Sequence, residues 1–248
     1  GEGGEKMSKS KGNVVLPEKV SERHGIDAAR FFLVSLASPD KDRDWSENGI
    51  EGSSKFLNRV YSYFKDAKKG KSSERTEHKI NSAIIGITES IENLRYDLAV
   101  IAIRNLFDSL DKEISKKDLE TLAILISPFC PHLSEELYEM LGSKPFVSNS
   151  RWPIADKSKI NQIFDKQDKA NEKIIADIMN VAKLLEEKEI KKVYIYAIPN
   201  EIEFYRQDEI KKRTGKDIFV YKVNDKDKYD PQNKAGKARP GKPAIFLE

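Results

Sequence analysis

Helical periodicity is the feature that most constrains the fold of this 248-residue chain. Apolar residues recur at the three- and four-residue spacing of an amphipathic helix in five stretches: residues 46–64, 80–94, 98–114, 119–126 and 162–189. Such helices bury one face against their neighbours. The first four stretches therefore predict an antiparallel bundle. Pro128 and Pro131 predict a break before a shorter helix at residues 132–141.

Two shorter helices are predicted ahead of the bundle. Pro17 suits a first helical turn, and Gly25 can end that helix, because glycine adopts the left-handed conformation of a C-terminal cap. Asp27 is predicted to cap the next helix. Residues 65–77, rich in lysine, serine and glycine, predict an exposed and mobile connection between helices.

The pattern changes near the C-terminus from helical to extended. Residues 193–198 and 218–223 are β-branched and aromatic, which is typical of strands, and they flank a predicted helix at residues 201–213. Residues 244–247 predict a third strand. The fold class is therefore mainly α with a small α+β end, divided into three parts: residues 1–50, 51–155 and 156–248.

Composition excludes several classes of protein. Cys130 is the only cysteine, so no disulfide forms within the chain, and the three histidines lie too far apart in sequence for a local zinc-ligand cluster. No apolar run approaches the roughly 18 residues that a membrane-spanning helix needs. We expect a soluble, cytoplasmic protein with no membrane partner and no metal site of its own.

Eight residues near the N-terminus carry the most specific chemistry. Residues 6–13 read KMSKSKGN and place three lysines, two serines and a glycine just ahead of a helix. A lysine ammonium is a point charge on a flexible stem that suits a triphosphate, and serine hydroxyls can join it. Gly12 supplies a turn. By composition alone, such an octamer is more often a solvated linker than a phosphate site.

The string KMSKS resembles the nucleotide-loop signature of class I aminoacyl-tRNA synthetases. The resemblance implies that ATP is a substrate, with Mg²⁺ expected from the family. It also implies that Lys9 interacts with the phosphates as the aminoacyl-adenylate forms and pyrophosphate leaves, and that Lys6 assists. The ATP-binding loop implied in this way consists of Lys6, Met7, Ser8, Lys9 and Ser10.

Further stretches narrow the resemblance to one subgroup. Residues 25–32 (GIDAARFF) and 127–137 (SPFCPHLSEEL) are similar to the synthetases for leucine, isoleucine, valine and methionine. The second stretch resembles their helical tRNA-binding domain, which is of the anticodon-binding type. The chain end, residues 238–248, is similar to leucyl enzymes of the archaeal type. Three further stretches look most like the leucyl enzyme: residues 44–46, 51–52 and 56–60.

The resemblance implies the C-terminal part of a leucyl-tRNA synthetase. This part would supply the KMSKS loop and tRNA binding for ATP-dependent leucyl-adenylate formation and leucyl transfer to tRNA(Leu). The HxGH-type signature, the amino-acid site and the editing domain are missing, so we expect no activity without an N-terminal catalytic portion. Two alternatives stay open: a free-standing tRNA-binding or assembly module that keeps the motif as a relic, and a fragment of a valyl- or isoleucyl-tRNA synthetase.

Positive charge is concentrated near the C-terminus. Residues 211–242 hold 11 Lys and Arg against 4 Asp and Glu, an excess of +7 in a chain whose net charge is +3. Such a segment suits phosphate contacts on a structured RNA, or a solvated tail. By resemblance, the chain end meets the long variable arm of the tRNA through Arg239, Lys242, Ile245, Phe246, Leu247 and Glu248. If the apolar members pair in a sheet instead, only Arg239, Lys242 and Glu248 would face RNA.

Overall fold

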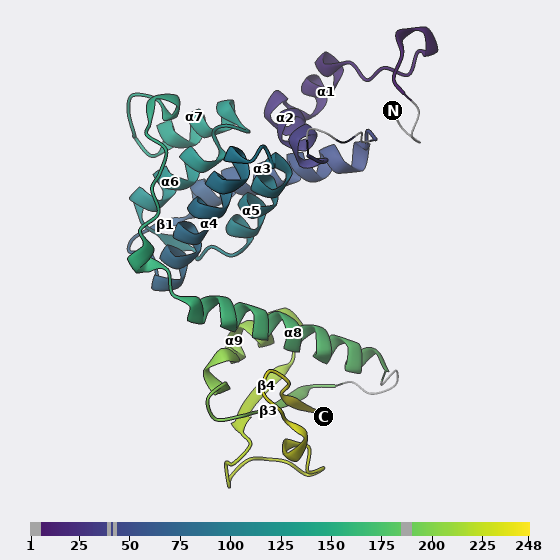
Figure 1. Cartoon of the computed structure of the whole chain (residues 1–248), viewed down its shortest axis with the longest axis vertical. Helices are drawn as coiled ribbons and strands as arrows, with labels where there is room; N and C mark the ends of the chain where they lie inside the picture. The colour runs from purple at the N-terminus through teal and green to yellow at the C-terminus, as the bar shows by residue number, and fades with distance from the viewer. Residues whose placement is uncertain (1–5, 39–40, 42–43, 185–189) are drawn as a thin grey trace. The chain divides into compact units, whose positions relative to one another are not determined.

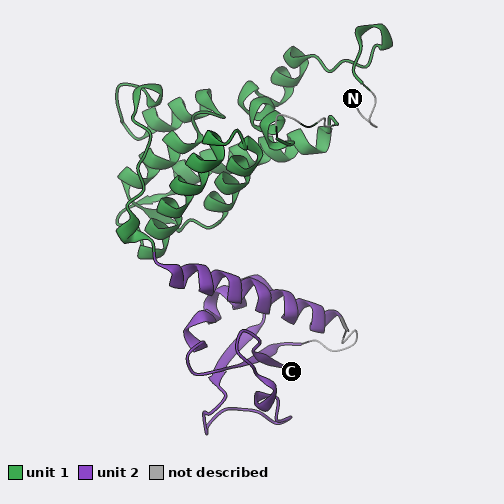
Figure 2. Ribbon diagram, in the orientation of Figure 1, with its two compact units in different colours: residues 1–160 green, residues 161–248 purple. Residues whose placement is uncertain are grey.

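The computed structural model describes residues 6–38, 41, 44–184 and 190–248 (Figure 1). The chain divides into two compact units, residues 1–160 and residues 161–248, which Figure 2 colours separately. Each unit has a hydrophobic core of its own. The sequence predicts three parts, whereas the structure divides into only two compact units. The further boundary near residue 50 therefore stays a prediction.

Unit 1 is helical, as its periodicity predicts. Serine side chains cap three of its helices: Ser46, Ser73 and Ser115 each accept a hydrogen bond from the backbone N–H three residues on. The last five helices form the predicted bundle. The helices are α1 Pro17–His24, α2 Ile26–Ser35, α3 Glu47–Asp66, α4 Glu74–Glu92, α5 Tyr96–Asp108, α6 Lys116–Ile126 and α7 Pro131–Met140.

The core of unit 1 is aromatic where α2 meets α3 and α5. Phe31 and Phe56 stack with their ring centroids 5.3 Å apart. The Arg104 guanidinium lies 5.0 Å from the first centroid and 4.8 Å from the second, and it donates to Ser53 Oγ at 3.0 Å. Because cation–π attraction is stronger where water is excluded, this partly buried arginine helps hold the three helices together.

One helix of unit 1 is shorter than predicted. The helix expected over residues 98–114 ends at Asp108, and Ile114 lies in a two-residue strand, β2 (Glu113–Ile114). This strand pairs in parallel with β1 (Lys68–Lys69). The connection at residues 65–77, which the sequence predicts to be mobile, is thus hydrogen-bonded to the loop between α5 and α6.

Unit 2 begins with α8 (Gln162–Leu184), and the remainder of that predicted helix, residues 185–189, lies outside the described residues. Its three predicted strands are confirmed to within one residue. The sheet order is β4-β3-β5, with β3 parallel to β4 and antiparallel to β5. The single helix predicted at residues 201–213 is instead a 3-10 turn followed by a helix. The elements are β3 Lys192–Ala197, η5 Ile202–Phe204, α9 Gln207–Thr214, β4 Asp217–Lys222 and β5 Ala244–Leu247.

The two faces of this sheet carry different side chains, because residues alternate along each strand. Aliphatic residues occupy the face that packs with α8 and α9: Val193, Ile195, Ile218, Val220, Ile245 and Leu247. Aromatic residues occupy the other face, where they pack with Ala235: Tyr194, Tyr196, Tyr221 and Phe246. The predicted fold class, mainly α with a small α+β end, is confirmed.

Candidate nucleotide loop and nucleic-acid interface

The loop at residues 6–13 is closed by its own hydrogen bonds. The Asn13 side chain accepts from the Ser8 N–H at 2.8 Å and donates to the Lys6 carbonyl at 3.3 Å. Between them a short 3-10 helix, η2 (Lys9–Lys11), ends at Gly12, whose φ is +67°. Glycine suits this turn because other residues rarely adopt a left-handed φ. No role was predicted for Asn13, although it ends the motif.

Three ammonium groups stand on the surface of this loop. Lys6, Lys9 and Lys11 are exposed, and none of them forms an ion pair within the described part of the chain. Cations without a neighbouring carboxylate attract phosphate groups. The hydroxyl oxygens of Ser8 and Ser10 lie 2.7 Å apart in a hydrogen bond. The turn thus brings together the five predicted loop residues, Lys6, Met7, Ser8, Lys9 and Ser10.

A small apolar cluster lies where the chain leaves the loop. The Trp45 indole meets the Phe32 ring edge-on at a centroid distance of 5.3 Å, and its Nε1–H donates to Glu47 at 3.1 Å. Since the cluster joins α1, α2 and α3, it anchors the chain just behind the loop. The members are Val15, Val20, Ala29, Phe32, Leu36, Trp45 and Ile50.

Asp27 caps a different helix from the one predicted. The N-cap of α2 is Gly25, and Asp27 lies in the first turn of α2, only 8% exposed. Its carboxylate accepts a hydrogen bond from the Leu133 N–H at 2.6 Å, and it lies 3.0 Å from Nδ1 of His132. The prediction that Asp27 caps α2 is therefore wrong. Its carboxylate instead accepts a hydrogen bond from a backbone N–H in the first turn of α7, where such groups have no acceptor within the helix.

The chain just before α7 is held by α2 as well. Arg30 donates to the carbonyl oxygens of Pro128 at 3.2 Å and Phe129 at 3.4 Å. Cys130, the next residue, is fully buried, and burial raises the pKa of its thiol well above the usual range, with the charge of Asp27 adding to the effect. A protonated, buried thiol is a poor nucleophile. This stretch is thus a structural joint between α2 and α7.

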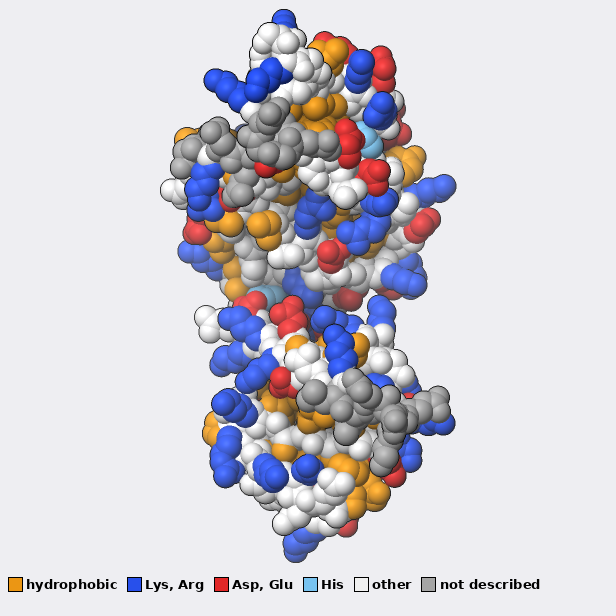
Figure 3. Space-filling model, turned by 90° about the vertical axis from the view of Figure 1, so that its right-hand side faces the viewer, with side chains coloured by type: hydrophobic (Ala, Val, Ile, Leu, Met, Phe, Trp, Pro, Cys, Tyr) orange, Lys and Arg blue, Asp and Glu red, His pale blue; other side chains and the backbone are white. Residues whose placement is uncertain are grey.

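Basic side chains surround the sheet of unit 2. On the face that Figure 3 shows, lysine and arginine side chains of unit 2 lie beside exposed hydrophobic ones. Lys211 pairs with Asp217 at 2.7 Å. The remaining exposed cations near β4 form no ion pair among the described residues: Lys212, Arg213, Lys222 and Lys226.

The apolar residues of the predicted tRNA contact lie in strand β5. Ile245 is paired with Ile195 of β3, and with Leu247 it packs on the helix-facing side of the sheet. Phe246 lies on the opposite, aromatic face. Of the two arrangements considered from the sequence, pairing in a sheet is the one observed, so Ile245 and Leu247 contribute to the core of unit 2.

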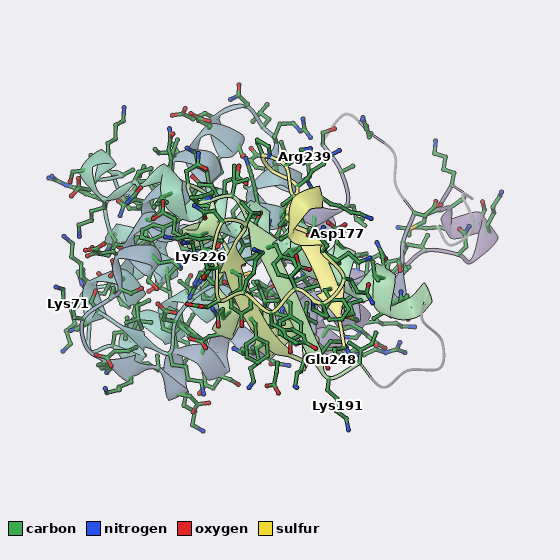
Figure 4. All side chains as sticks on the ribbon, turned by 90° about the horizontal axis from the view of Figure 1, so that it is seen from below. Lys71, Asp177, Lys191, Lys226, Arg239 and Glu248 are labelled. Carbon is green, nitrogen blue, oxygen red and sulfur yellow. The ribbon has the colours of Figure 1, made fainter. Side chains whose placement is uncertain are left out.

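The polar residues of that predicted contact lie at both ends of β5, as Figure 4 shows for Arg239 and Glu248. Arg239 and Lys242 exchange two backbone hydrogen bonds at 2.9 Å, which form a tight turn and leave both residues exposed. Glu248 accepts a hydrogen bond from the Tyr194 hydroxyl at 3.0 Å. The structure therefore does not bring the predicted contacts together into one cluster.

The described residues hold no group of three or more His, Cys, Asp or Glu side chains that could bind a metal ion. Nor is any helix among those described residues both long and apolar enough to cross a membrane.

Two family models match the chain. Residues 75–197 match the anticodon-binding domain of tRNA ligase, and residues 1–46 match the class I tRNA synthetases for I, L, M and V. The first match covers α4 to α7 and continues to the end of β3. Four helices of the bundle, α4 to α7, are therefore similar to an anticodon-binding domain, the type that the sequence predicts.

Several known proteins are similar to the chain. The leucine–tRNA ligase of Trichormus variabilis is 34% identical over 227 residues, covering 76% of this chain and 26% of the relative. That of Rickettsia bellii is 31% identical over 230 residues, covering 80% and 27%. A solved LeuRS-tRNA-LeuAMS ternary complex from Agrobacterium radiobacter has a TM-score of 0.57 at 25% identity, covering 64% of this chain and 23% of that one.

The chain spans about a quarter of the length of the curated relatives that it matches. These relatives are leucine–tRNA ligases from bacteria and give no support to the archaeal-type resemblance of the chain end.

Proposed function

We infer that this chain is a portion of a leucine–tRNA ligase, a class I aminoacyl-tRNA synthetase. The complete enzyme would form leucyl-adenylate from leucine and ATP and transfer the leucyl group to tRNA(Leu) in the cytoplasm. The observation that carries this proposal is the self-closed KMSKS loop, with three uncompensated lysines, joined through α2 to a bundle of the anticodon-binding type. We do not extend the proposal to an archaeal-type enzyme.

The chemistry proposed for the loop is electrostatic. The Lys6 and Lys9 ammonium groups would bind the phosphates of ATP and stabilise the negative charge that develops as pyrophosphate leaves. Apart from Met7, the loop residues are lysine, serine, glycine and asparagine, which fit phosphate oxygens and not a cation, so Mg²⁺ would be held by the phosphates themselves. The amino-acid site would come from an N-terminal catalytic portion, as the resemblance to class I synthetases implies.

The second role proposed is tRNA binding by the bundle and by the basic unit 2. The excess of +7 in residues 211–242 favours contacts with phosphates, and binding of this kind weakens steeply with salt. A free-standing tRNA-binding module and a valyl or isoleucyl enzyme remain as competing hypotheses, but the relatives named above, all leucine–tRNA ligases, do not favour them.

Salt-titrated binding of the chain to three RNAs tests the proposal: leucine tRNA, the same tRNA without its long variable arm, and valine tRNA. We expect a preference for intact leucine tRNA that is lost with the arm. Equal binding to all three would remove the leucine assignment. Mixing the chain with the N-terminal portion of the enzyme separates a ligase portion from a free-standing module. A ligase portion is expected to restore aminoacylation. A free-standing module is expected to bind tRNA without restoring aminoacylation.

A further inference from the structure

Unit 2 carries a row of three aromatic rings across its sheet, one from each strand. Tyr194 of β3 is in register with Phe219 of β4 and with Phe246 of β5. Its ring stacks on Phe219 at a centroid distance of 5.1 Å and an interplanar angle of 17°, and on Phe246 at 5.8 Å and 27°. We call these three residues the aromatic ladder. Cross-strand aromatic pairs stabilise a sheet. This stabilisation explains why the rings are stacked, but it does not explain why one of them is exposed to solvent.

The ladder is open to solvent at one end. β4 is an edge strand, and its Phe219 is 36% exposed, while Tyr194 in the middle is 6% exposed. A fourth ring, Tyr229, reaches over Tyr194 at 4.8 Å and is 44% exposed. Tyr229 also lies 6.3 Å from Phe246. One exposed aromatic residue is ordinary, but here two exposed rings contact the same buried ring, Tyr194.

The loop that carries Tyr229 is held in place by hydrogen bonds. The backbone carbonyl of Tyr229 accepts a hydrogen bond from the Tyr196 hydroxyl. The Asp230 carboxylate accepts from the backbone N–H groups of Lys234 at 2.7 Å and Ala235 at 2.9 Å. The ring therefore sits on a fixed turn above the sheet, and a ligand would not have to order it.

The segment that carries Phe219 and Tyr229 is basic overall, with an excess of +7 over residues 211–242, although Asp225, Asp227 and Asp230 flank Tyr229. Lys212 and Arg213 lie near the end of the helix that leads into β4. Lys222 ends β4 on the face opposite Phe219, because residues alternate along a strand, and Lys226 follows in the loop that carries Tyr229. All four are exposed and without an ion pair among the described residues, whereas the nearby Asp217 is paired with Lys211. Exposed aromatic rings in a segment with an excess of cations fit a polyanion that has aromatic groups of its own.

We propose that the two exposed rings, Phe219 at the end of the aromatic ladder and Tyr229 above Tyr194, are stacking sites for unpaired nucleobases of RNA. A base has a flat π-face that can extend the ladder beyond Phe219, and exposed lysines of the same basic segment contact the phosphates along the strand. This inference deepens the tRNA binding proposed for unit 2 and rests on it. It adds the chemical group that is bound and assigns the stacking to two residues.

Binding of the full chain to labelled RNA tests the inference. The probes are single-stranded oligouridine and oligoadenosine of about 12 nucleotides and a fully paired duplex of the same length, each titrated at several salt concentrations. Phe219→Leu keeps apolar bulk at the strand edge but removes the π-face, and Phe219→Trp restores a ring. Phe146→Leu is the matched control, because Phe146 is 60% exposed but lies in unit 1. Circular dichroism verifies that each variant is folded.

We expect Phe219→Leu to weaken binding of the single strands about 5- to 150-fold without changing the salt dependence, since no charge is lost. Duplex binding should change less than about twofold, and Phe219→Trp should restore single-strand binding. Lys222→Gln should instead weaken all probes and reduce the salt dependence.

Unchanged single-strand binding by Phe219→Leu overturns the inference, as does an equal loss for duplex and single strands. A change in self-association without a change in RNA binding also overturns it, because the face would then contact protein. Failure of the inference and failure of the proposed function are distinguishable. A chain that prefers intact leucine tRNA but is insensitive to Phe219→Leu keeps the function and loses the stacking surface. A chain whose single-strand binding is weakened by Phe219→Leu but that binds all three tRNAs equally keeps the stacking surface and loses the proposed function.

Discussion

The carboxylate of Asp27 accepts a hydrogen bond at 2.6 Å from the backbone N–H of Leu133, 106 positions further along the chain. This bond joins α2, just behind the KMSKS loop, to the first turn of α7 in the bundle. A negative charge at a helix N-terminus satisfies an otherwise unpaired N–H and interacts favourably with the helix dipole. α2 and the bundle are thereby joined within unit 1.

Replacing Asp27 should therefore destabilise unit 1. We expect Asp27→Ala to lower the free energy of unfolding by about 1–3 kcal/mol, because the partly buried N–H of Leu133 loses its acceptor. Asp27→Asn keeps an acceptor oxygen and should cost less. Urea unfolding followed by circular dichroism measures both, and Glu139→Ala, an exposed change on α7, is the control. Equal stability of Asp27→Ala and the control would show that the bond does not join the helices.

Cys130 should be unreactive in the folded protein. Its thiol is fully buried, and its pKa is raised first by burial and then by the charge of Asp27, so the reactive thiolate is not formed. We expect alkylation by iodoacetamide to be slow in buffer and to become fast on addition of denaturant, as mass spectrometry would record. Rapid alkylation without denaturant would mean that the joint between α2 and α7 opens readily.

The link between β1 and β2 depends on a buried hydroxyl. Ser72, 4% exposed, donates to the Asp118 carboxylate and accepts from the Ser115 N–H at 2.9 Å. Ser72→Ala leaves both partners without this bond, and we expect a loss of about 1–3 kcal/mol in the free energy of unfolding. Ser62→Ala, an exposed change on α3, should have little effect. Hydrogen exchange of residues 68–70 would show whether the pairing is lost.

The elements of this fold are largely predictable from sequence because helix and strand periodicity are local properties. Partners distant in sequence are not. Asp27 precedes an apolar helical run and so resembles that helix's own cap, yet its acceptor role depends on α7. Ile114 continues the spacing of α5 but pairs as a strand with a connection some 45 residues earlier. Both errors arise because tertiary contacts override a local preference.

The candidate sites differ in the same way. The KMSKS loop is recognisable as a string, and the signal for Asn13 was available in the same motif, since an Asn side chain readily bonds to nearby backbone. The aromatic ladder has no such signal. Tyr194, Phe219 and Phe246 lie in separate strands, and only the register of the sheet makes them neighbours.

The proposed role of the loop predicts a specific defect in catalysis. In the complete ligase, Lys9→Ala should strongly reduce the rate of leucyl-adenylate formation, because an ammonium aimed at the leaving phosphates is lost. Binding of tRNA should be nearly unchanged, since the loop is remote in sequence from the basic segment of unit 2. ATP–pyrophosphate exchange measures the first quantity and filter binding the second. Lys19→Ala, an exposed lysine of α1, is the control, and adenylate formation at the parental rate in Lys9→Ala would rule out the role.

The hydrogen bond between Tyr194 and Glu248 predicts how stability responds to alkaline pH. Burial, followed by this bond, raises the pKa of Tyr194 from 10.0 to about 12. Between these values the unfolded chain ionises its phenol while the folded chain retains the proton. The stabilisation is therefore complete below about pH 10 and is lost as the pH rises toward about 12. Urea unfolding across this range should show a shallower decline for Tyr194→Phe than for the parent. Glu248→Gln should lie between them, because it removes the carboxylate but leaves the burial, which is the larger cause. If Tyr194→Phe declines as steeply as the parent, the phenol is not the group that titrates.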